Sequence, residues 1–344
     1  MSSHDVKSVP TLMDVARLAG VSTATVSRCL NDPNRVIAST QEKVMQAVQE
    51  LGYAPNFSAR SLAARRTNTV GAVIPTMDNA IFARGLQAFQ EELHQNGITL
   101  LVASSQYSPA VEDEQIRTLV ARGADALLLI GYHRTPEIYD FLKSRDVPTL
   151  VAWVFDPGVG ELSIGFDNRG AMRTLAEQVL ALGHRRLGFV SADRASNDRA
   201  RARVDGVQDA MRAQGLDPDT LDVVETTYAI ENGAAACATL LGRPDPPSVI
   251  MCGNDVLAVG AIRGARRLGL SVPDDVSITG FDDIELAGVA DPPLTTVHVP
   301  HREMGREAAR MLVALLNRET PVTTRELTTR LCLRDTLCAP KNRQ

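Results

Sequence analysis

Apolar residues recur every three or four positions over the first fifty residues of the chain, and this spacing predicts three short helices. Thr11 and Asp14 form an N-cap pair for the first helix, and Gly20 follows it where a left-handed residue ends a helix most easily. A third helix is expected from Ser39, as the start of a capping box, to Gly52.

The second helix, capped by Ser22, differs from its neighbours in the side chains that it is expected to expose. Val26 and Leu30 are expected to face inward. The outward positions carry small side chains and one arginine: Thr23, Ala24, Thr25, Ser27 and Arg28. Such a surface fits the major groove of DNA, where bulk clashes and arginine can bond guanine. The pattern therefore indicates a helix-turn-helix, with an ordinary helical hairpin as the alternative.

Beyond residue 68 the pattern changes to short apolar runs that alternate with amphipathic segments. The expected strands are residues 70–75, 99–104, 126–132, 148–153, 187–192, 222–226, 248–254 and 276–283. The expected helices include residues 80–96, 111–122, 169–182, 198–214 and 254–268. This alternation is typical of parallel sheets covered by helices on both faces. Its length favours two doubly wound lobes facing each other across a cleft.

Charge is distributed unevenly along the 344 residues, whose formal net charge is -5. The first 68 residues contain eight basic and five acidic side chains and so carry +3, which leaves -8 for the remainder. The positive charge thus accompanies the helix-turn-helix, where phosphates would bind. A charge this modest implies that one copy of the chain binds DNA weakly. We therefore expect two copies of the helix-turn-helix to bind DNA together.

Composition and motifs exclude several other classes of protein. The five cysteines are scattered and form no C-x-x-C pair, so neither a disulfide framework nor a metal site is expected. No G-x-G-x-x-G, P-loop or G-x-S-x-G motif is present, and no cofactor or enzymatic activity is expected. No membrane span or signal peptide is evident, which predicts a cytoplasmic protein and argues against a periplasmic sugar-binding protein.

Polar and aromatic side chains gather where the predicted strands end, at the edge where open α/β sheets bind ligands. His133 and Tyr228 follow two of the predicted strands, Trp153 and Asn254 end two others, and Asp167 follows the Gly165–Phe166 pair. Carboxylates and amides bond hydroxyl pairs, and aromatic faces pack on the CH side of a sugar ring. These residues therefore indicate a polyhydroxylated ligand. Plainer roles remain open, since Asn168 and Asp283 could simply cap helices.

The run from Thr11 to Asn31, followed by YAPNFSARSL and TNTVG, resembles the LacI (lactose repressor) family of bacterial transcription regulators. The order of parts extends over essentially the whole chain. The resemblance implies a helical DNA-binding head and an α/β core like that of periplasmic binding proteins. The expected divisions are a head (1–54), a hinge helix and linker (55–68) and an effector-binding and dimerisation core (69–344). The core should form lobe one (69–166 and 300–325) and lobe two (167–299 and 326–344).

The same resemblance assigns roles on DNA to particular side chains. It places Thr23, Ala24 and Arg28 on bases, and Thr25, Ser27 and Asn31 on phosphates. Leu62 matches the hinge leucine that wedges into the minor groove, while Ala63 lacks the contact that a lysine there supplies in some relatives. The complete set of expected DNA-binding residues is Ser22, Thr23, Ala24, Thr25, Ser27, Arg28, Asn31, Asn56, Ala59 and Leu62.

Effector-pocket positions of the family align with several of the strand-end residues, and Arg203 is the strongest of them. The expected effector-binding residues are Asn79, Phe82, His133, Trp153, Asp167, Arg203, Tyr228, Asn254 and Asp282. His301 stands where the family sometimes has a phenylalanine, so the far wall of the pocket differs here.

Four basic side chains, Arg199, Arg203, His133 and Arg134, slightly favour a sugar acid over a neutral sugar, and the HRTPEIYDFL segment is similar to gluconate repressors within the family. Asp78, Asp167 and Asp282 argue against a carboxylate. A purine-type corepressor is the third candidate.

A single helix-turn-helix reads only a few base pairs, so a homodimer on a pseudo-palindromic operator is expected. The end of the chain lacks the leucine heptads with which some relatives tetramerise. The whole pattern predicts a repressor, most simply of a carbohydrate or sugar-acid catabolic operon, that a small effector controls allosterically. The sequence leaves open whether that effector induces or corepresses.

Overall fold

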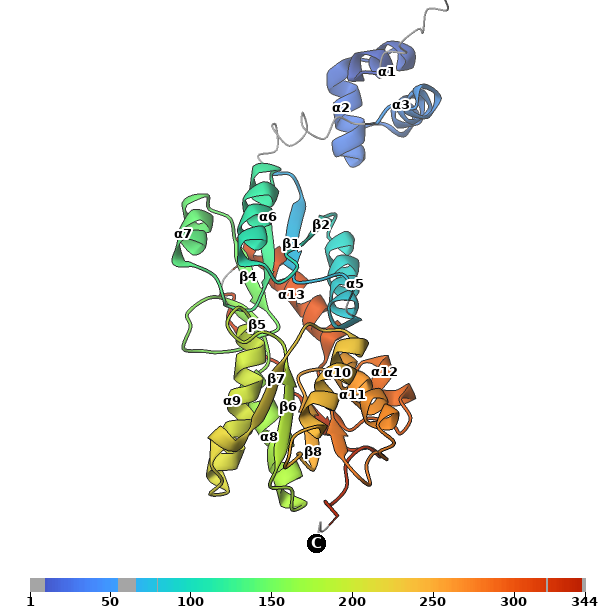
Figure 1. The fold of residues 1–344 in the computed structure, drawn as a ribbon. Coiled ribbons are helices and arrows are strands. Elements are labelled where there is room, and N and C mark those ends of the chain that lie inside the picture. The colour runs from blue at the N-terminus through green and yellow to red at the C-terminus, as the bar shows by residue number, and fades with distance from the viewer. Residues whose placement is uncertain (1–9, 55–65, 79, 320, 342–344) are drawn as a thin grey trace, which may run out of the picture. The chain divides into compact units, whose positions relative to one another are not determined.

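A computed structural model describes residues 10–54, 66–78, 80–319 and 321–341. The chain divides into two compact units, Met1–Thr67 and Asn68–Gln344. We describe each unit by itself, the first as the head and the second as the core (Figure 1).

The head is a small helical unit with its own apolar centre. Its elements are α1 (Leu12–Ala19), α2 (Thr23–Asn31), the short 3-10 turn η1 (Pro33–Arg35) and α3 (Ala38–Leu51). The predicted cap of α1 is confirmed, because the Thr11 N–H donates to Asp14 at 3.0 Å and Gly20 has φ 66°. The buried centre consists of Val15, Ala16, Val26, Cys29, Val44 and Ala47.

One detail of the head differs from the predictions. The third helix begins at Ala38 and not after a Ser39 cap, because the Ile37 carbonyl already accepts the Thr40 N–H at 2.9 Å. In α2, Val26 and Cys29 are buried, and Leu30 is half-buried and packs against the same apolar centre, so its predicted inward position is confirmed.

The core contains a parallel six-stranded sheet with the order β11-β5-β4-β3-β1-β2. Its strands are β1 (Thr69–Ile74), β2 (Thr99–Ser104), β3 (Ala126–Ile130), β4 (Thr149–Ala152), β5 (Ser163–Gly165) and β11 (Arg325–Glu326). All five strand pairings in this sheet are parallel, as the alternating sequence pattern predicts.

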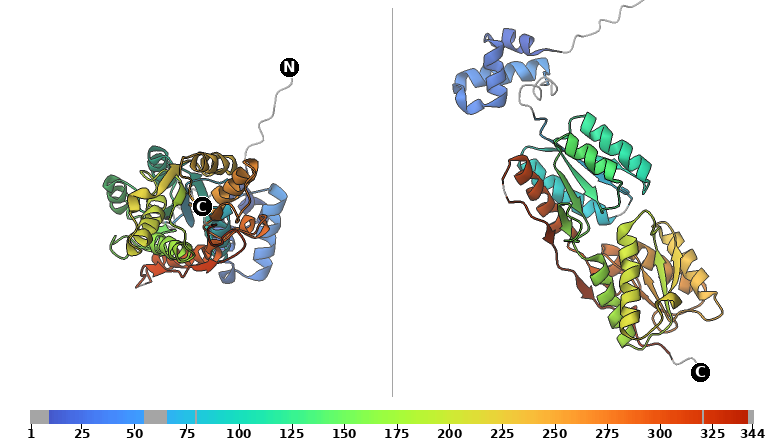
Figure 2. Two further views of the ribbon diagram at one scale, coloured as in Figure 1. Left: turned by 60° about the horizontal axis from the view of Figure 1, so that its bottom comes forward. Right: turned by 90° about the vertical axis from the view of Figure 1, so that its left-hand side faces the viewer.

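Helices cover both faces of this sheet, and together they form what we call lobe one. The helices are α5 (Ala80–Gln95), α6 (Pro109–Ala121), α7 (Pro136–Ser144) and α13 (His301–Leu316). Figure 2 shows α6 and α7 on one side of the sheet and α5 and α13 on the other. The packing of β3 is consistent with this arrangement. Leu127 and Leu129 pack with α6 and α7, whereas Leu128 packs on the opposite face of the sheet.

A second parallel sheet, ordered β7-β6-β8-β9, forms the centre of lobe two. Its strands are β6 (Leu187–Ser191), β7 (Asp222–Glu225), β8 (Val249–Cys252) and β9 (Ser277–Thr279). Its helices are α8 (Asn168–Ala181), α9 (Asp198–Ala213), α10 (Ile230–Leu241), α11 (Asp255–Arg267) and the short α12 (Glu285–Val289), with a 3-10 turn η2 at Pro218–Thr220.

The chain passes between the lobes three times, after β5, before α13 and after β11. Near the second and third passages, β10 (Thr296–His298) pairs antiparallel with β12 (Arg330–Cys332). The lobes therefore share their connecting strands, and this arrangement allows them to move about a common hinge.

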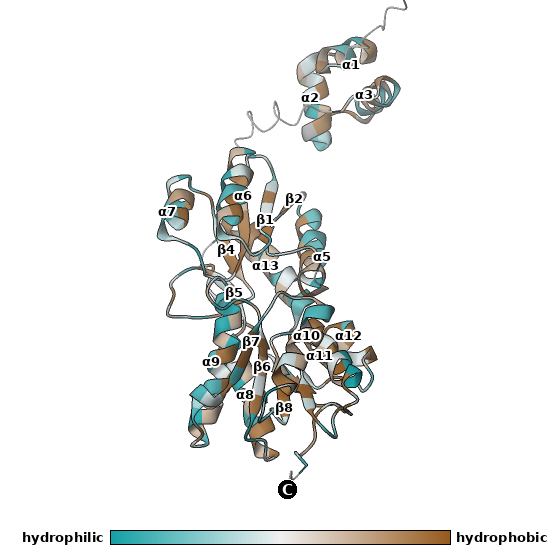
Figure 3. Ribbon diagram, in the orientation of Figure 1, coloured by the Kyte–Doolittle hydropathy of each residue, from teal (hydrophilic) through white to brown (hydrophobic). Residues whose placement is uncertain are grey.

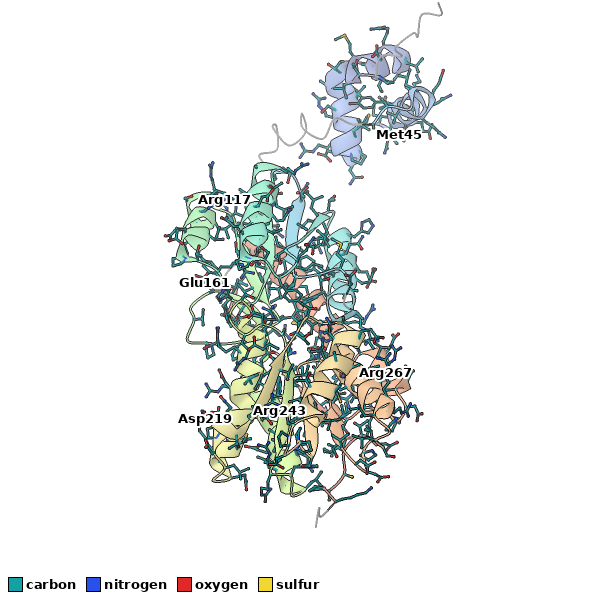
Figure 4. The ribbon with its side chains drawn as sticks, in the orientation of Figure 1. Met45, Arg117, Glu161, Asp219, Arg243 and Arg267 are labelled. Carbon is teal, nitrogen blue, oxygen red and sulfur yellow. The ribbon has the colours of Figure 1, made fainter. Side chains whose placement is uncertain are left out.

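Apolar residues fill the strands and the inward helix faces, while the outer helix faces are polar (Figure 3). Arg117 and Arg267 lie on those outer faces and pair with Asp113 and Glu231 (Figure 4). Within the described residues, no helix is both long enough and apolar enough to cross a membrane.

Candidate functional sites

The outer face of α2 is small, polar and accessible. Thr23, Ala24 and Arg28 are exposed, whereas Val26 between them is fully buried and fixes which face points outward. This places two short side chains and one guanidinium on a single helix surface, which suits direct contact with base edges.

The start of α2 is fixed by its own hydroxyl groups. Ser22 Oγ accepts the Thr25 N–H at 3.1 Å, and the two side-chain oxygens lie 2.9 Å apart. Thr25 and Ser27 are half-buried, and Asn31 is the last residue of the helix. The other expected DNA contacts, Asn56, Ala59 and Leu62, lie outside the described residues and stay predictions.

A small cavity of about 30 Å³ lies between the two lobes, at the carboxyl ends of their strands. Lobe one contributes Ile81, Phe82, Tyr107 and Trp153 to its walls, and lobe two contributes Asn197, Arg199, Arg203, Tyr228, Asn254 and Asp282. The cavity is only large enough for about one water molecule. A larger ligand would require the lobes to separate.

Arg203, on α9, is the cation at the centre of this cavity and is only 5% exposed. Its Nε donates to Asn168 Oδ1 at 3.0 Å, one Nη donates to the Gly253 carbonyl, and its guanidinium lies 3.9 Å from the centre of the Phe281 ring. Asn168 in turn donates to the Trp153 carbonyl at 3.0 Å. Asn168 is therefore no helix cap, because Asp167 fills that role, and instead it joins Arg203 to lobe one.

Asp282, which follows β9, is a fully buried carboxylate with no hydrogen-bond partner for either oxygen among the described residues. Its Oδ1 lies 3.7 Å from both Arg203 Nη2 and His301 Nε2. Burial raises the pKa of Asp282 to about 6, against the opposing effect of Arg203 and Arg199. The backbone φ of 105° adds strain that a non-glycine residue rarely tolerates.

Other buried polar atoms near this carboxylate also lack partners within the described residues. They are Trp153 Nε1, Asn254 Nδ2 and both ring nitrogens of His301. Burial lowers the pKa of His301 to about 3, so its imidazole is neutral at pH 7. Buried polar atoms are nearly always paired, so such a concentration around one cavity indicates a site for a polar ligand.

Aromatic rings form the remaining walls. Phe82 and Trp153 lie with ring centres 5.4 Å apart, and Trp153 also stacks near His301. Across the cleft, Tyr107 of lobe one and Tyr228 of lobe two meet with ring centres 5.6 Å apart. These apolar faces sit next to the unpaired polar atoms, which is the combination that sugar rings require.

Two of the expected effector residues that the structure describes do not line this cavity. His133 is exposed on the loop after β3. Asp167 caps α8, its Oδ1 accepting the Gly170 N–H at 2.9 Å, and it lines a separate open depression of about 680 Å³. Asn79 lies outside the described residues.

The expectation that Arg134 makes the cleft electropositive is also wrong. Arg134 is buried within lobe one, where it donates to Glu112 at 2.6 Å and to the Ile130 carbonyl at 3.0 Å. Asp283 likewise caps no helix, because it pairs with Arg334 at 2.6 Å and with His298 at 2.9 Å.

Sequence reasoning missed Ile81, Tyr107 and Asn197 as cavity residues, and it named Arg199 only as a source of charge. Tyr107 follows β2 within three residues, so the strand-end rule used for the other strands would have found it. Asn197 had a signal as well, because it caps α9 through the Ala200 N–H at 3.2 Å. Ile81 carries no such signal.

Within the described residues, no group of three or more histidine, cysteine, aspartate or glutamate side chains is arranged to hold a metal ion.

Comparison with known proteins supports both parts of the chain. The family described as "Bacterial regulatory proteins, lacI family" matches residues 11–56, and a periplasmic binding protein-like domain matches residues 176–337. The regulator DegA of Bacillus subtilis (strain 168) is 34% identical over 304 residues, which cover 87% of this chain and 89% of DegA.

Two solved structures extend the likeness to the whole fold. The lac repressor dimer bound to operator and the anti-inducer ONPF superposes with a TM-score of 0.84 at 27% identity, covering 96% of this chain and 99% of that one. A CelR–cellobiose complex gives a TM-score of 0.69 at 31% identity, covering 95% and 99%.

A helix-turn-helix head followed by a two-lobed core of this kind defines a DNA-binding transcriptional regulator and not an enzyme. The chain belongs to the LacI family of bacterial transcriptional regulators.

Proposed function

We propose that this regulator is a repressor whose interlobe cavity binds a neutral sugar, and that binding releases it from the operator of a carbohydrate catabolic operon. The observation that carries the proposal is the set of unpaired buried polar atoms around Asp282. Hydroxyl groups can satisfy all of them, because a hydroxyl both donates to a carboxylate and accepts from an indole or amide N–H.

The charges favour a neutral sugar over a sugar acid. Arg203 already bonds Asn168 and the Gly253 carbonyl, and Arg199 pairs with Asp198 at 2.9 Å. A ligand carboxylate would then lie beside the buried Asp282 carboxylate, and two buried like charges are costly. The similarity to a regulator solved with cellobiose points in the same direction. A sugar acid remains the second candidate because Arg199 and Arg203 both face the cavity.

The proposed allosteric route follows from the topology. Because the three interlobe passages share one region, a ligand that changes the angle between the lobes would also move the start of the core, to which the head is joined. Operator and effector must then weaken each other's binding by the same factor. A dimer on a pseudo-palindromic operator is part of this proposal, supported by the lac repressor dimer on its operator.

The first test is a thermal-shift screen of the purified protein against neutral sugars, sugar acids and purines. A neutral sugar at a hundred times its dissociation constant should stabilise the folded state by roughly 2.7 kcal/mol. Asp282→Asn should lose this shift, whereas Asp140→Asn, an exposed change on α7, should keep it. Stabilisation by sugar acids alone, or by purines alone, would contradict the neutral-sugar proposal.

The second test concerns Arg28 and uses an operator selected from random DNA. Arg28→Ala should cost about 1–3 kcal/mol of binding and relax the preference at one base pair in each half-site. Arg35→Ala, an exposed change in η1, should leave the sequence preference intact. An unchanged preference in the Arg28 variant would remove this residue from base reading.

Leu62 provides a separate test of the hinge wedge that the family resemblance implies. Leu62→Ala should weaken operator binding, because a minor-groove wedge would be lost, while thermal stabilisation by the effector stays the same. Equal operator affinity would exclude the wedge.

A further inference from the structure

The turn after β3 in lobe one touches the start of α9 in lobe two beside the cavity. Asp198 Oδ2 accepts the backbone N–H of Tyr132 at 2.6 Å, and its Oδ1 accepts both the backbone N–H and the Nη1–H of Arg199 at 2.9 Å. We call this set, Gly131, Tyr132, Asp198 and Arg199, the interlobe latch. The side chains of Asp198 and Arg199 are 14% and 11% exposed, so the contact is largely shielded from water.

Lobe one holds its half of the latch rigidly. The Tyr132 hydroxyl donates to Ser163 Oγ at 2.7 Å and accepts the Asp156 N–H at 3.2 Å, while the Gly131 N–H donates to the Ala152 carbonyl at 3.0 Å. The Tyr132 N–H therefore has a fixed position within lobe one. Asp198 can reach it only when lobe two is close, so the bond depends on the separation of the lobes.

The latch leaves no room for a side chain at position 131. A Cβ on Gly131 would overlap Arg199 Nη1 and lie 2.5 Å from Asp198 Oδ1, and the residue has φ 73°. Both neighbouring atoms are the ends of side chains that belong to the other lobe. A methyl group here would displace the groups that hold the lobes together, while the interior packing of lobe one would stay intact.

The latch also forms a wall of the effector cavity. Arg199 lines both this cavity and the neighbouring open depression of about 680 Å³. The guanidinium that Asp198 holds is therefore part of a wall that the two spaces share. Opening of the latch would change that wall.

We propose that Gly131 and Asp198 are positioning residues that latch the two lobes together and control access of ligand to the cavity. Gly131 provides the space, and Asp198 provides the bond. The inference rests on the proposed effector role of the cavity, but its test needs no effector, so the two can fail separately.

The single tryptophan of the chain supplies the readout, because Trp153 lines the cavity and is only 2% exposed. In the full-length protein, Gly131→Ala should shift the Trp153 emission to the red and raise its acrylamide quenching constant about twofold or more, as the open population grows. Gly97→Ala is the matched control, with φ 68° and nothing within 4 Å of the new methyl group. It carries the same backbone strain in the same lobe and should quench like the parent protein.

Variants of Asp198 test the bond independently of the glycine. Asp198→Ala should increase quenching as Gly131→Ala does, and Asp198→Asn should restore much of the protection, because its amide oxygen can still accept the Tyr132 N–H. Circular dichroism would verify that each variant is folded. The proposal would be overturned if Gly131→Ala and Asp198→Ala both had the quenching constant of the parent protein. It would also be overturned if the quenching constant rose as much in the Gly97→Ala control as in Gly131→Ala.

Discussion

Asp282 combines three unfavourable features that a stable fold would normally avoid. Its carboxylate is fully buried, neither oxygen has a hydrogen-bond partner among the described residues, and its backbone is in a strained region. Burying a charge without hydrogen bonds is costly, so the ionised form of Asp282 destabilises this closed arrangement even though Arg203 Nη2 lies 3.7 Å away. A ligand that donates hydrogen bonds to it would relieve that cost, and this links the strain to binding.

The stability of the protein should therefore depend on pH through Asp282. Its pKa is raised from 3.8 to about 6 on folding, so between these values the folded state holds the proton longer than the unfolded chain. Folding stability contributed by this proton is present below pH 3.8 and is lost as the pH rises towards 6. Asp282→Asn removes the effect, and its Tm relative to the parent should rise across this interval.

The measurement is a series of thermal melts of both proteins from acid to neutral pH. His301 has a lowered pKa and so favours folding as the pH rises, but it is present in both proteins, as are Arg199 and Arg203. Asp140→Asn serves as the exposed control. If the parent and Asp282→Asn profiles run parallel, the raised pKa is wrong.

At the scale of single residues, the family resemblance assigned Arg203 and Asp282 to an effector pocket, and both line the interlobe cavity. Their contact with an effector stays a prediction. Arg134 was misplaced, since the sequence does not show that it pairs with Glu112 of α6 inside lobe one. Long-range pairing of this kind depends on the assembled fold.

Two pairs of helices in the core pack closely where one helix has a glycine. A Cβ on Gly305 of α13 would collide with the Gly85 carbonyl of α5, and one on Gly206 of α9 would collide with the Arg169 carbonyl of α8. In these pairs the backbones touch without side chains between them. Such positions cannot accept alanine, although alanine is the better helix former.

Gly305→Ala should consequently lower the free energy of unfolding by about 1–3 kcal/mol, since the new methyl group meets backbone that cannot rotate away. Gly288→Ala in α12 is the control, because nothing lies within 4 Å of its added methyl group. There the gain in helix propensity should leave stability unchanged or raise it by up to about 1 kcal/mol. Urea denaturation of the parent protein, Gly305→Ala and Gly288→Ala would measure these free energies of unfolding. An equal loss of stability in the two variants would contradict the packing argument.

At the scale of elements, the hydrophobic pattern predicted the long segments well. The helix expected at 198–214 is observed at Asp198–Ala213, and the strand at 99–104 is observed at Thr99–Ser104. The two- and three-residue strands β5, β10, β11 and β12 were not predicted, because so few residues carry no detectable alternation. They exist through pairing with partners distant in sequence, such as β11 with β5.

The whole molecule consists of two units, each with its own apolar centre. The fragment Asn68–Gln344 should therefore fold alone, with a Tm within about 3 °C of the core transition in the full protein, since no part of its interior is removed. Thermal melts followed by circular dichroism would show this. A much lower Tm would mean that the head contributes to the stability of the core.

The passage of the chain between the lobes has a consequence during synthesis on the ribosome. Strands β1 to β5 of lobe one are complete by Gly165, but α13, which packs against α5 and β4, ends only at Leu316. Roughly 150 residues must be added in between, which takes on the order of ten seconds at cellular elongation rates. Throughout that interval one apolar face of the first sheet has α5 but lacks α13, the second of its covering helices. Lobe two, although it is made later, can complete most of its structure first, so the nascent first half is the part of the chain that requires protection from aggregation.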